Sequence, residues 1–74
     1  MRLTEARRTR LLSIRALAER AGLATRTINE IELGRTTPSL LTIKKISEVL
    51  EIDPLEIDEF RKAIRGNSMA PANV

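Results

Sequence analysis

Four polar side chains have the types and the spacing to contact the edges of nucleic-acid bases. They are Thr25, Arg26, Asn29 and Glu30. Arg can donate two hydrogen bonds to guanine, Asn can pair with adenine, Glu can accept from cytosine, and Thr can touch the thymine methyl group. Arg26, Asn29 and Glu30 would share one face of a helix, because residues three and four apart lie on the same side. The spacing also fits a weak surface ion pair between Arg26 and Glu30, so that alternative stays open.

A helix, a short turn and a second helix are predicted to hold these four side chains in place. Ser13 is a favourable N-cap for a helix over residues 14–21, in which apolar residues recur at the spacing of one helix face. Gly22 then ends that helix, because glycine adopts the left-handed conformation without strain. The second helix covers residues 25–33. A short glycine-containing turn between two helices is typical of the helix-turn-helix motif, here residues 14–33, whose second helix enters the major groove of DNA.

Three further helices complete the predicted fold, an all-α domain of five short helices in residues 1–66. Their expected bounds, each after its N-cap, are 5–10 after Thr4, 40–50 after Ser39 and 54–65 after Asp53. Gly66 is expected to end the last helix, and residues 67–74 are expected to form a disordered C-terminal tail. No stretch of the sequence alternates polar and apolar residues with the period of a strand, so we expect no sheet.

Charge and composition exclude several functions. The 74 residues contain 13 Lys and Arg and 10 Asp and Glu, for a net charge of +3. Residues 1–37 hold eight Arg and four Glu, an excess of +4. Arg suits phosphate and guanine, so this half favours a nucleic-acid partner, although a solvated helix surface can have the same composition. The chain contains no Cys and no His, which removes the cysteine nucleophile, the usual general base and the commonest metal ligands. We therefore expect neither an enzyme nor a metal or cofactor site.

Several short segments recur at fixed spacing in a known family. They are Leu12-Ser13, the run from Leu17 to Leu23, Thr27-Ile28, Ile31-Glu32, and Gly34-Arg35 through Pro38-Ser39-Leu40. With them, residues 3–57 resemble the Cro/phage-repressor family, also called the xenobiotic-response-element family. The resemblance implies a compact five-helix, lambda-repressor-like DNA-binding domain that works as a dimer on a partly palindromic operator in double-stranded DNA. It also implies a small transcriptional regulator of bacterial or phage origin, most typically a repressor or controller. Because the sequence has neither a membrane span nor a signal-peptide core, we expect a cytoplasmic protein that associates with the nucleoid when it is bound to DNA.

The resemblance assigns roles to further residues. Arg7 and Glu32 are expected to form a partly buried ion pair that ties the first helix to the end of the recognition helix, residues 25–33. Contacts with the DNA backbone are expected near the start of the motif and after its end. The residues expected to make them are Ser13, Ile14, Arg15, Arg35, Thr36, Thr37 and Lys44.

Four departures from the family pattern leave alternatives open. One is that Leu33 and Leu41 are apolar where polar residues are common, so Leu33 is a candidate contact to a DNA sugar and Leu41 a candidate contact to a partner.

The other three departures concern single residues. Ile14 replaces the usual Gln, so it either touches a sugar or thymine methyl group or packs inward. Ala24 replaces the usual Ser or Thr cap, which costs about 0.5–2 kcal/mol unless Thr25 caps the helix instead of reading a base. Glu30 is acidic where polar or basic residues are common, and an acidic group near phosphates weakens non-specific binding. These departures favour an alternative function, a protein-interaction module or antitoxin that keeps the fold with weak or no DNA binding of its own.

The fifth helix is the expected dimer element. Its apolar residues cover more than one side, which is more than a monomer core of this size needs. The predicted interface consists of Leu55, Ile57, Phe60 and Ile64. The alternative is that Leu55 only covers the fourth helix. A dimer would place two recognition helices about 34 Å apart, one turn of B-DNA.

Of the other classes of partner, the sequence leaves only a protein partner open. The apolar runs are far shorter than a membrane span, and the N-terminus has no signal-peptide core, so no membrane partner is expected. No second domain offers a dedicated ligand pocket, so we expect no small-molecule ligand. Regulation by concentration, by proteolysis or by a protein partner is the remaining expectation.

Overall fold

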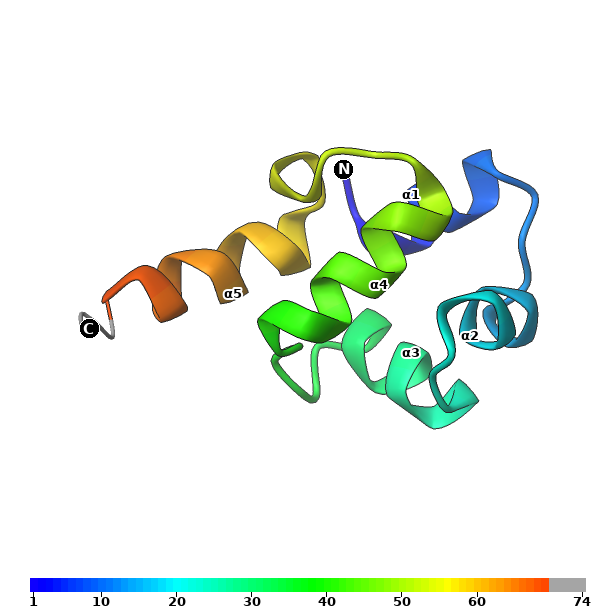
Figure 1. The fold of residues 1–74 in the computed structure, drawn as a ribbon, viewed down its shortest axis with the longest axis horizontal. Helices are drawn as coiled ribbons and strands as arrows, with labels where there is room; N and C mark the ends of the chain where they lie inside the picture. Colours follow the sequence, from blue (N-terminus) through cyan, green and yellow to red (C-terminus); the bar gives the residue numbers. More distant parts are fainter. Residues whose placement is uncertain (70–74) are drawn as a thin grey trace.

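Helices are the regular elements of the structure, a computed structural model that describes residues 1–69 (Figure 1). The elements are α1 (Leu3–Thr9), α2 (Ile14–Ala21), α3 (Thr25–Glu32), α4 (Leu40–Leu50), the short 3-10 helix η1 (Pro54–Glu56) and α5 (Asp58–Met69). The predicted all-α fold with five α-helices is confirmed for this part of the chain. None of its helices has the length and apolar character that a membrane span needs.

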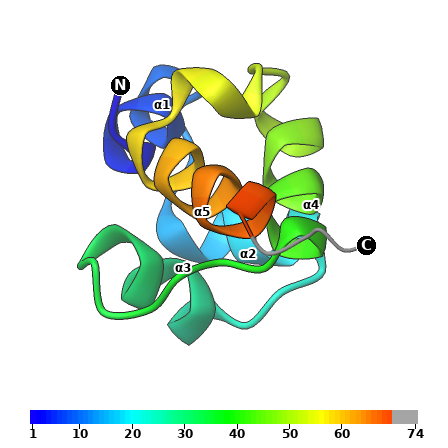
Figure 2. The ribbon, with the colours of Figure 1, turned by 90° about the vertical axis from the view of Figure 1, so that its left-hand side faces the viewer.

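One hydrophobic core joins the five α-helices, and each of them contributes to it. The largest fully buried side chains are Leu3, Leu17, Ile28, Ile31, Ile46, Leu50, Ile57 and Phe60. In Figure 2, which looks along α5, the helices α1, α3 and α4 are arranged around that helix. Each such side chain contributes about 1.5–3 kcal/mol when it leaves water. The shared core therefore fixes α3 relative to the other helices.

The N-caps predicted for α2 and α4 explain where these helices begin, and the glycine predicted to end α2 explains where that helix stops. Ser13 Oγ accepts a hydrogen bond from the backbone N of Ala16 at 3.0 Å, and Ser39 Oγ accepts one from Thr42 N at 3.2 Å. Gly22, directly after α2, has φ +69°, a left-handed conformation in which any other residue would be strained. The bounds predicted for α2 and α4 are confirmed.

The first helix begins earlier than predicted, and Thr4 is not its cap. Arg2 is the N-cap, and its backbone N donates to Glu5 Oε1 at 2.8 Å, so Glu5 satisfies the helix start. Thr4 lies inside α1, and its Oγ1 donates instead to Glu32 Oε1 at 3.1 Å. The bond to Glu32 therefore uses the hydroxyl that the sequence indicates as a helix cap.

The predicted helix over residues 54–65 is broken into two elements. Asp53 caps the first of them as predicted, since its Oδ1 accepts from Leu55 N at 2.9 Å. The chain then becomes extended at Ile57 (φ −102°, ψ 122°), which buries this side chain completely. The backbone N of Asp58 donates to Met1 O at 2.7 Å rather than to a helical carbonyl. Contact with the N-terminal segment therefore interrupts the helix.

The prediction that Gly66 ends the last helix is also wrong, because α5 continues through Gly66 to Met69. A Cβ added at Gly66 would meet no atom within 4 Å, so nothing in its surroundings requires glycine. Residues 67–69 of the predicted tail are helical, and residues 70–74 lie outside the described part.

Candidate nucleic-acid interface

The two faces of α3 have opposite character. Ile28 and Ile31 are fully buried on one face, in contact with the core, and the neighbouring turn adds the half-buried Leu23. On the other face, Thr25, Arg26 and Asn29 are exposed. The buried face anchors the helix against α2, and the exposed face lies at the edge of the molecule (Figure 1). The exposed side chains of α3 that could contact DNA are therefore carried by a helix that the core holds in place.

Glu30 pairs with Arg35 rather than with Arg26. The Oε2 atom of Glu30 lies 3.6 Å from Nη1 of Arg35, and Arg26 has no ion pair within residues 1–69. The alternative of an Arg26–Glu30 surface pair is thus not formed. The side chain of Arg35 is 66% exposed, so solvent screens its attraction to Glu30 and the pair is weak. A phosphate could replace Glu30 as the partner of Arg35 at small cost.

Thr25 does not cap the recognition helix. Ala24 is the N-cap of α3, and no side chain accepts a hydrogen bond at this helix start. The Thr25 side chain makes no hydrogen bond to any residue in the described part of the chain. Its hydroxyl therefore stays available for a ligand.

Replacing Ala24 with serine is expected to raise the free energy of unfolding by about 0.5–2 kcal/mol, because a serine hydroxyl can accept from a free backbone N–H of α3. Urea denaturation measures the change. Ser13→Ala is the matched control, since it removes the corresponding bond from α2 and should lower stability by a similar amount. Equal stabilities of the wild type and the Ala24→Ser variant would contradict the prediction.

The residues predicted to contact the DNA backbone fall into three groups. Ser13 and Arg15 are exposed at the start of α2, and Arg35, Thr36 and Thr37 are exposed in the loop between α3 and α4. Ile14 is half-buried and packs against the core, which favours the inward alternative left open above. Lys44 is exposed on α4, but it borders a groove between α4 and α5.

Arg7 and Glu32 form the predicted ion pair, and both are buried. Arg7 Nε donates to Glu32 Oε2 at 2.7 Å, and its Nη2 donates to Oε1 at 3.2 Å. The third guanidinium nitrogen, Nη1, donates to Leu12 O at 2.9 Å. Thr4 adds the bond to Glu32 described above. This network connects α1, the loop after it and the last residue of α3, so it fixes the orientation of the recognition helix at its C-terminal end.

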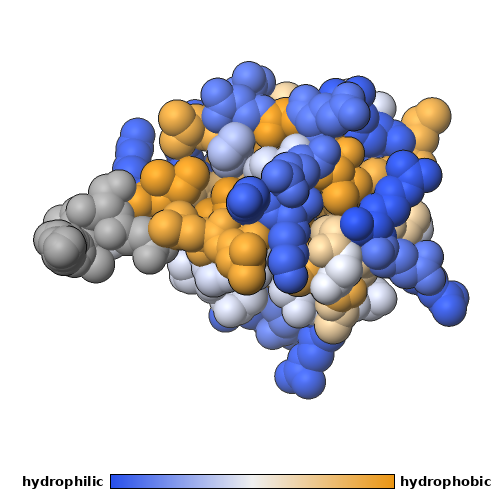
Figure 3. All heavy atoms as spheres, in the orientation of Figure 1, coloured by the Kyte–Doolittle hydropathy of each residue, from blue (hydrophilic) through white to orange (hydrophobic). Residues whose placement is uncertain are grey.

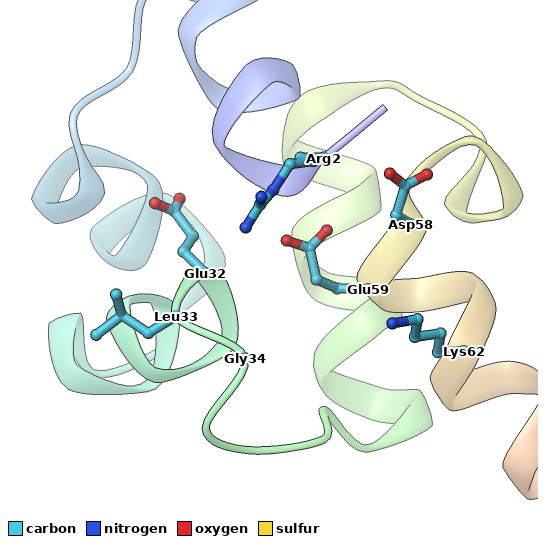
Figure 4. A pocket seen from close by; sticks show the side chains of 7 residues that line it. All are labelled: Arg2, Glu32, Leu33, Gly34, Asp58, Glu59 and Lys62. Atoms are coloured by element: carbon cyan, nitrogen blue, oxygen red, sulfur yellow. The ribbon is translucent and has the colours of Figure 1, made fainter.

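A charged hollow of about 290 Å³ lies beside this network (Figure 4). The Arg2 side chain points into the space between Glu32 and Glu59. Glu59 Oε1 accepts from Leu3 N at 2.9 Å, and Asp58 Oδ1 accepts from Arg61 at 2.6 Å. Two carboxylates that line the hollow therefore connect helices: Glu32 joins α3 to α1, and Glu59 joins α5 to α1. No pattern in the sequence predicts this role of Glu59, because its partner is a backbone N distant in the chain.

The predicted dimer interface needs a correction. Ile57 and Phe60 are fully buried in the core of the single chain, so they have no surface to offer to a second chain. Ile64 is half-buried, and Leu55 is 52% exposed, so part of the surface of both side chains is accessible to another molecule. Two leucines at the start of α4, Leu40 and Leu41, are also exposed; Leu41 is the further candidate for a partner contact that the sequence indicates.

A recognition helix anchored on one face, a preceding helix and a left-handed glycine between them define a helix-turn-helix domain. The chain matches the helix-turn-helix family over residues 3–57, and it belongs to the Cro/phage-repressor type of that family. It is 45% identical over 51 residues to an uncharacterized HTH-type transcriptional regulator, RghRB, of Bacillus subtilis (strain 168). The match covers 68% of this chain and 37% of that relative, so the chain spans little more than a third of its length. No solved structure matches the chain significantly.

Proposed function

We propose that the chain is a sequence-specific regulator of transcription that binds a partly palindromic operator in double-stranded DNA as a dimer, most simply as a repressor. The observation that carries the proposal is the exposed face of α3. The side chains of Thr25, Arg26 and Asn29 are exposed and make no hydrogen bond or ion pair within residues 1–69, while the opposite face is anchored in the core. Membership of the helix-turn-helix family and the name of the Bacillus relative support it.

The proposal divides the positive charge of the first half among several roles. Arg26 reads a base together with Thr25 and Asn29, and Glu30 discriminates by accepting from cytosine or by excluding wrong bases. Arg15 and Arg35 bind phosphates on either side of the groove. The backbone N–H groups at the start of α2 do the same, because a helix N-terminus attracts anions. Each phosphate neutralised adds about 0.9 to the salt slope of log K.

The test is selection of bound sequences from random DNA, followed by Arg26→Ala. The variant is expected to lose about 1–3 kcal/mol of binding free energy and to relax its preference at one position in each half-site. Arg20→Ala, an exposed arginine on α2 with no assigned contact, is the control and should change neither. A uniform loss across all sequences would instead make Arg26 a phosphate contact.

The protein-interaction module remains the second candidate, because two observations favour it. Ile14 packs inward where the family uses a polar contact to DNA, and Glu30 places an acidic group on the reading face. Retention on DNA separates the two functions. The regulator should bind operator DNA and be released as salt rises, since counterion release drives its binding. A chain that shows no salt-dependent retention on any selected sequence would support the module.

A further inference from the structure

The C-terminal end of α3 carries two acidic side chains, and each of them pairs with an arginine from another part of the chain. Glu32 pairs with Arg7 of α1. Glu30 pairs with Arg35 of the loop after α3. The carbonyl groups at a helix C-terminus are themselves negative, and the last turn of α3 contains no basic residue. The two arginines therefore neutralise a helix end that would otherwise be strongly acidic.

The two pairs differ in burial and in geometry. Arg7 makes two hydrogen bonds to Glu32, the shorter of 2.7 Å, and the two side chains are 10% and 8% exposed. Arg35 approaches Glu30 only to 3.6 Å, and its side chain is 66% exposed. Burial strengthens a charge pair, and solvent weakens it. The Arg7–Glu32 pair is therefore a fixed part of the fold, whereas the Glu30–Arg35 pair can open without disturbing the core.

The backbone places Arg35 beside Glu30. After α3, Gly34 adopts a left-handed φ of +73°, and its N donates to Ile31 O at 3.0 Å. The N of Arg35 donates to Glu30 O at 2.9 Å. These two bonds form a Schellman motif, in which the side chains at the positions of Glu30 and Arg35 frequently make an apolar contact. An ion pair takes the place of that contact here, so the way in which the helix ends determines the pair.

Both members of the pair lie beside the face of α3 that is proposed to read DNA. Glu30 is one helical turn after Arg26, on the same side of the helix. Arg35 begins the loop whose exposed residues are proposed to contact phosphates. In Figure 3, hydrophilic side chains project from the lower edge of the molecule, at which α3 and this loop lie in Figure 1. A duplex that admits α3 to its major groove therefore presents phosphates and base edges to both partners.

We propose that the Glu30–Arg35 pair is a specificity device that DNA must open. This inference rests on the proposed function and couples two residues of its interface. On any duplex a phosphate replaces Glu30 as the partner of Arg35, so opening the pair lowers the affinity for every sequence. The Glu30 carboxylate gains a new partner only where the amino group of a cytosine faces it. The opening is therefore offset at the operator alone, which widens the difference between specific and non-specific binding.

A cycle of single and double substitutions tests the exchange on a duplex of random sequence. Glu30→Ala is expected to tighten binding about two- to fivefold, which corresponds to the strength of an exposed ion pair. In the Arg35→Ala background the same substitution should have a clearly smaller effect, because no pair remains to be opened. Arg15→Ala is the matched background, since Arg15 is exposed and has no ion pair within residues 1–69, and there Glu30→Ala should keep its full effect. Equal effects with and without Arg35 would overturn the proposal, because Glu30 would then only repel phosphates.

Fluorescence anisotropy of labelled duplexes over a series of salt concentrations measures these affinities, and circular dichroism melting shows that each variant is folded. Arg35→Ala should lower the salt slope of log K by about 0.9 for each subunit, since one phosphate contact is lost. An unchanged slope would contradict the exchange with phosphate. Glu48→Ala, an equal charge change on the exposed side of α4, is the control and should leave the affinity nearly unchanged.

The operator obtained by selection tests the effect on specificity. Glu30→Ala should tighten binding to the operator less than binding to random DNA, by about twofold or more, because the contact with cytosine is lost only there. The same gain on both duplexes would refute the specificity role. A wild-type chain without salt-dependent binding to any duplex contradicts the proposed function itself. Independent effects of Glu30 and Arg35 in a chain that does bind DNA contradict only this inference.

Discussion

Replacement of Arg7 with alanine is expected to lower the free energy of unfolding by about 3–5 kcal/mol, the cost of leaving one partner of a buried ion pair unpaired. The side chains of Arg7 and Glu32 are only 10% and 8% exposed. The substitution removes two bonds to Glu32 and one to Leu12 O, and it leaves the Glu32 carboxylate with Thr4 as its remaining side-chain partner. Since small domains have about 5–15 kcal/mol of stability in total, thermal and urea denaturation should show a large loss.

Two matched variants separate the ion pair from the general effect of losing an arginine. Arg8→Ala removes an exposed neighbour on the same helix and should leave the melting temperature nearly unchanged. The double variant Arg7→Met with Glu32→Leu should be more stable than Arg7→Ala, because two apolar side chains leave no unpaired charge. Any folded Arg7→Ala protein should keep the sequence preference of the wild type. A melting temperature equal to that of the wild type would contradict the structural role of the pair.

The elements that local signals specify are the ones that the sequence predicts correctly. Helices α2 and α4 each have a serine N-cap and an apolar face at helical spacing, and both begin and end at the predicted residues. The capping bonds join residues three apart, and among the described residues no distant partner takes the hydroxyl of either serine. The motif and the exposed face of α3 follow from the same local rules, and for that reason the candidate reading residues could be identified.

Elements that depend on distant partners were harder to predict. Thr4 has the residue type of an N-cap, yet Glu32 occupies its hydroxyl. Asp53 and Pro54 predict a continuous helix, yet the chain extends at Ile57 and Asp58 N bonds to Met1 O. The Glu30–Arg35 pair was missed for the same reason, because helical spacing says nothing about a residue in the following loop. At Thr4 and at Ile57, a contact with a distant part of the chain outweighs the local preference.

The dimer interface shows a second limit of sequence patterns. The spacing of Ile57, Phe60 and Ile64 correctly indicates that they are apolar positions of one segment. Spacing cannot tell whether that surface meets the core of its own chain or a second copy, because both environments select the same residue types. In the structure, the backbone is extended at Ile57, and the side chains of Ile57 and Phe60 are fully buried in the core of their own chain.

Phe60→Ala is therefore expected to act on the single chain. Phe60 is the largest fully buried side chain, and its truncation should cost about 3–5 kcal/mol of unfolding free energy through lost burial and a cavity. Urea denaturation at several protein concentrations measures this. The loss should be the same at concentrations where the wild type is monomeric and where it is dimeric, since the side chain is buried within one chain.

A residue at the dimer interface would behave differently. Truncation of such a residue would weaken the association that stabilises the folded chain. The loss of unfolding free energy would therefore appear only at protein concentrations at which the dimer forms. Leu55→Ala is the matched control, because Leu55 precedes the same helix but is half exposed, and it should lower stability far less than Phe60→Ala. A loss for Phe60→Ala that vanishes in the monomer would return this side chain to the interface. A loss of stability that persists in the monomer assigns the Phe60 side chain to the core of the single chain. The position of α3 depends on that core.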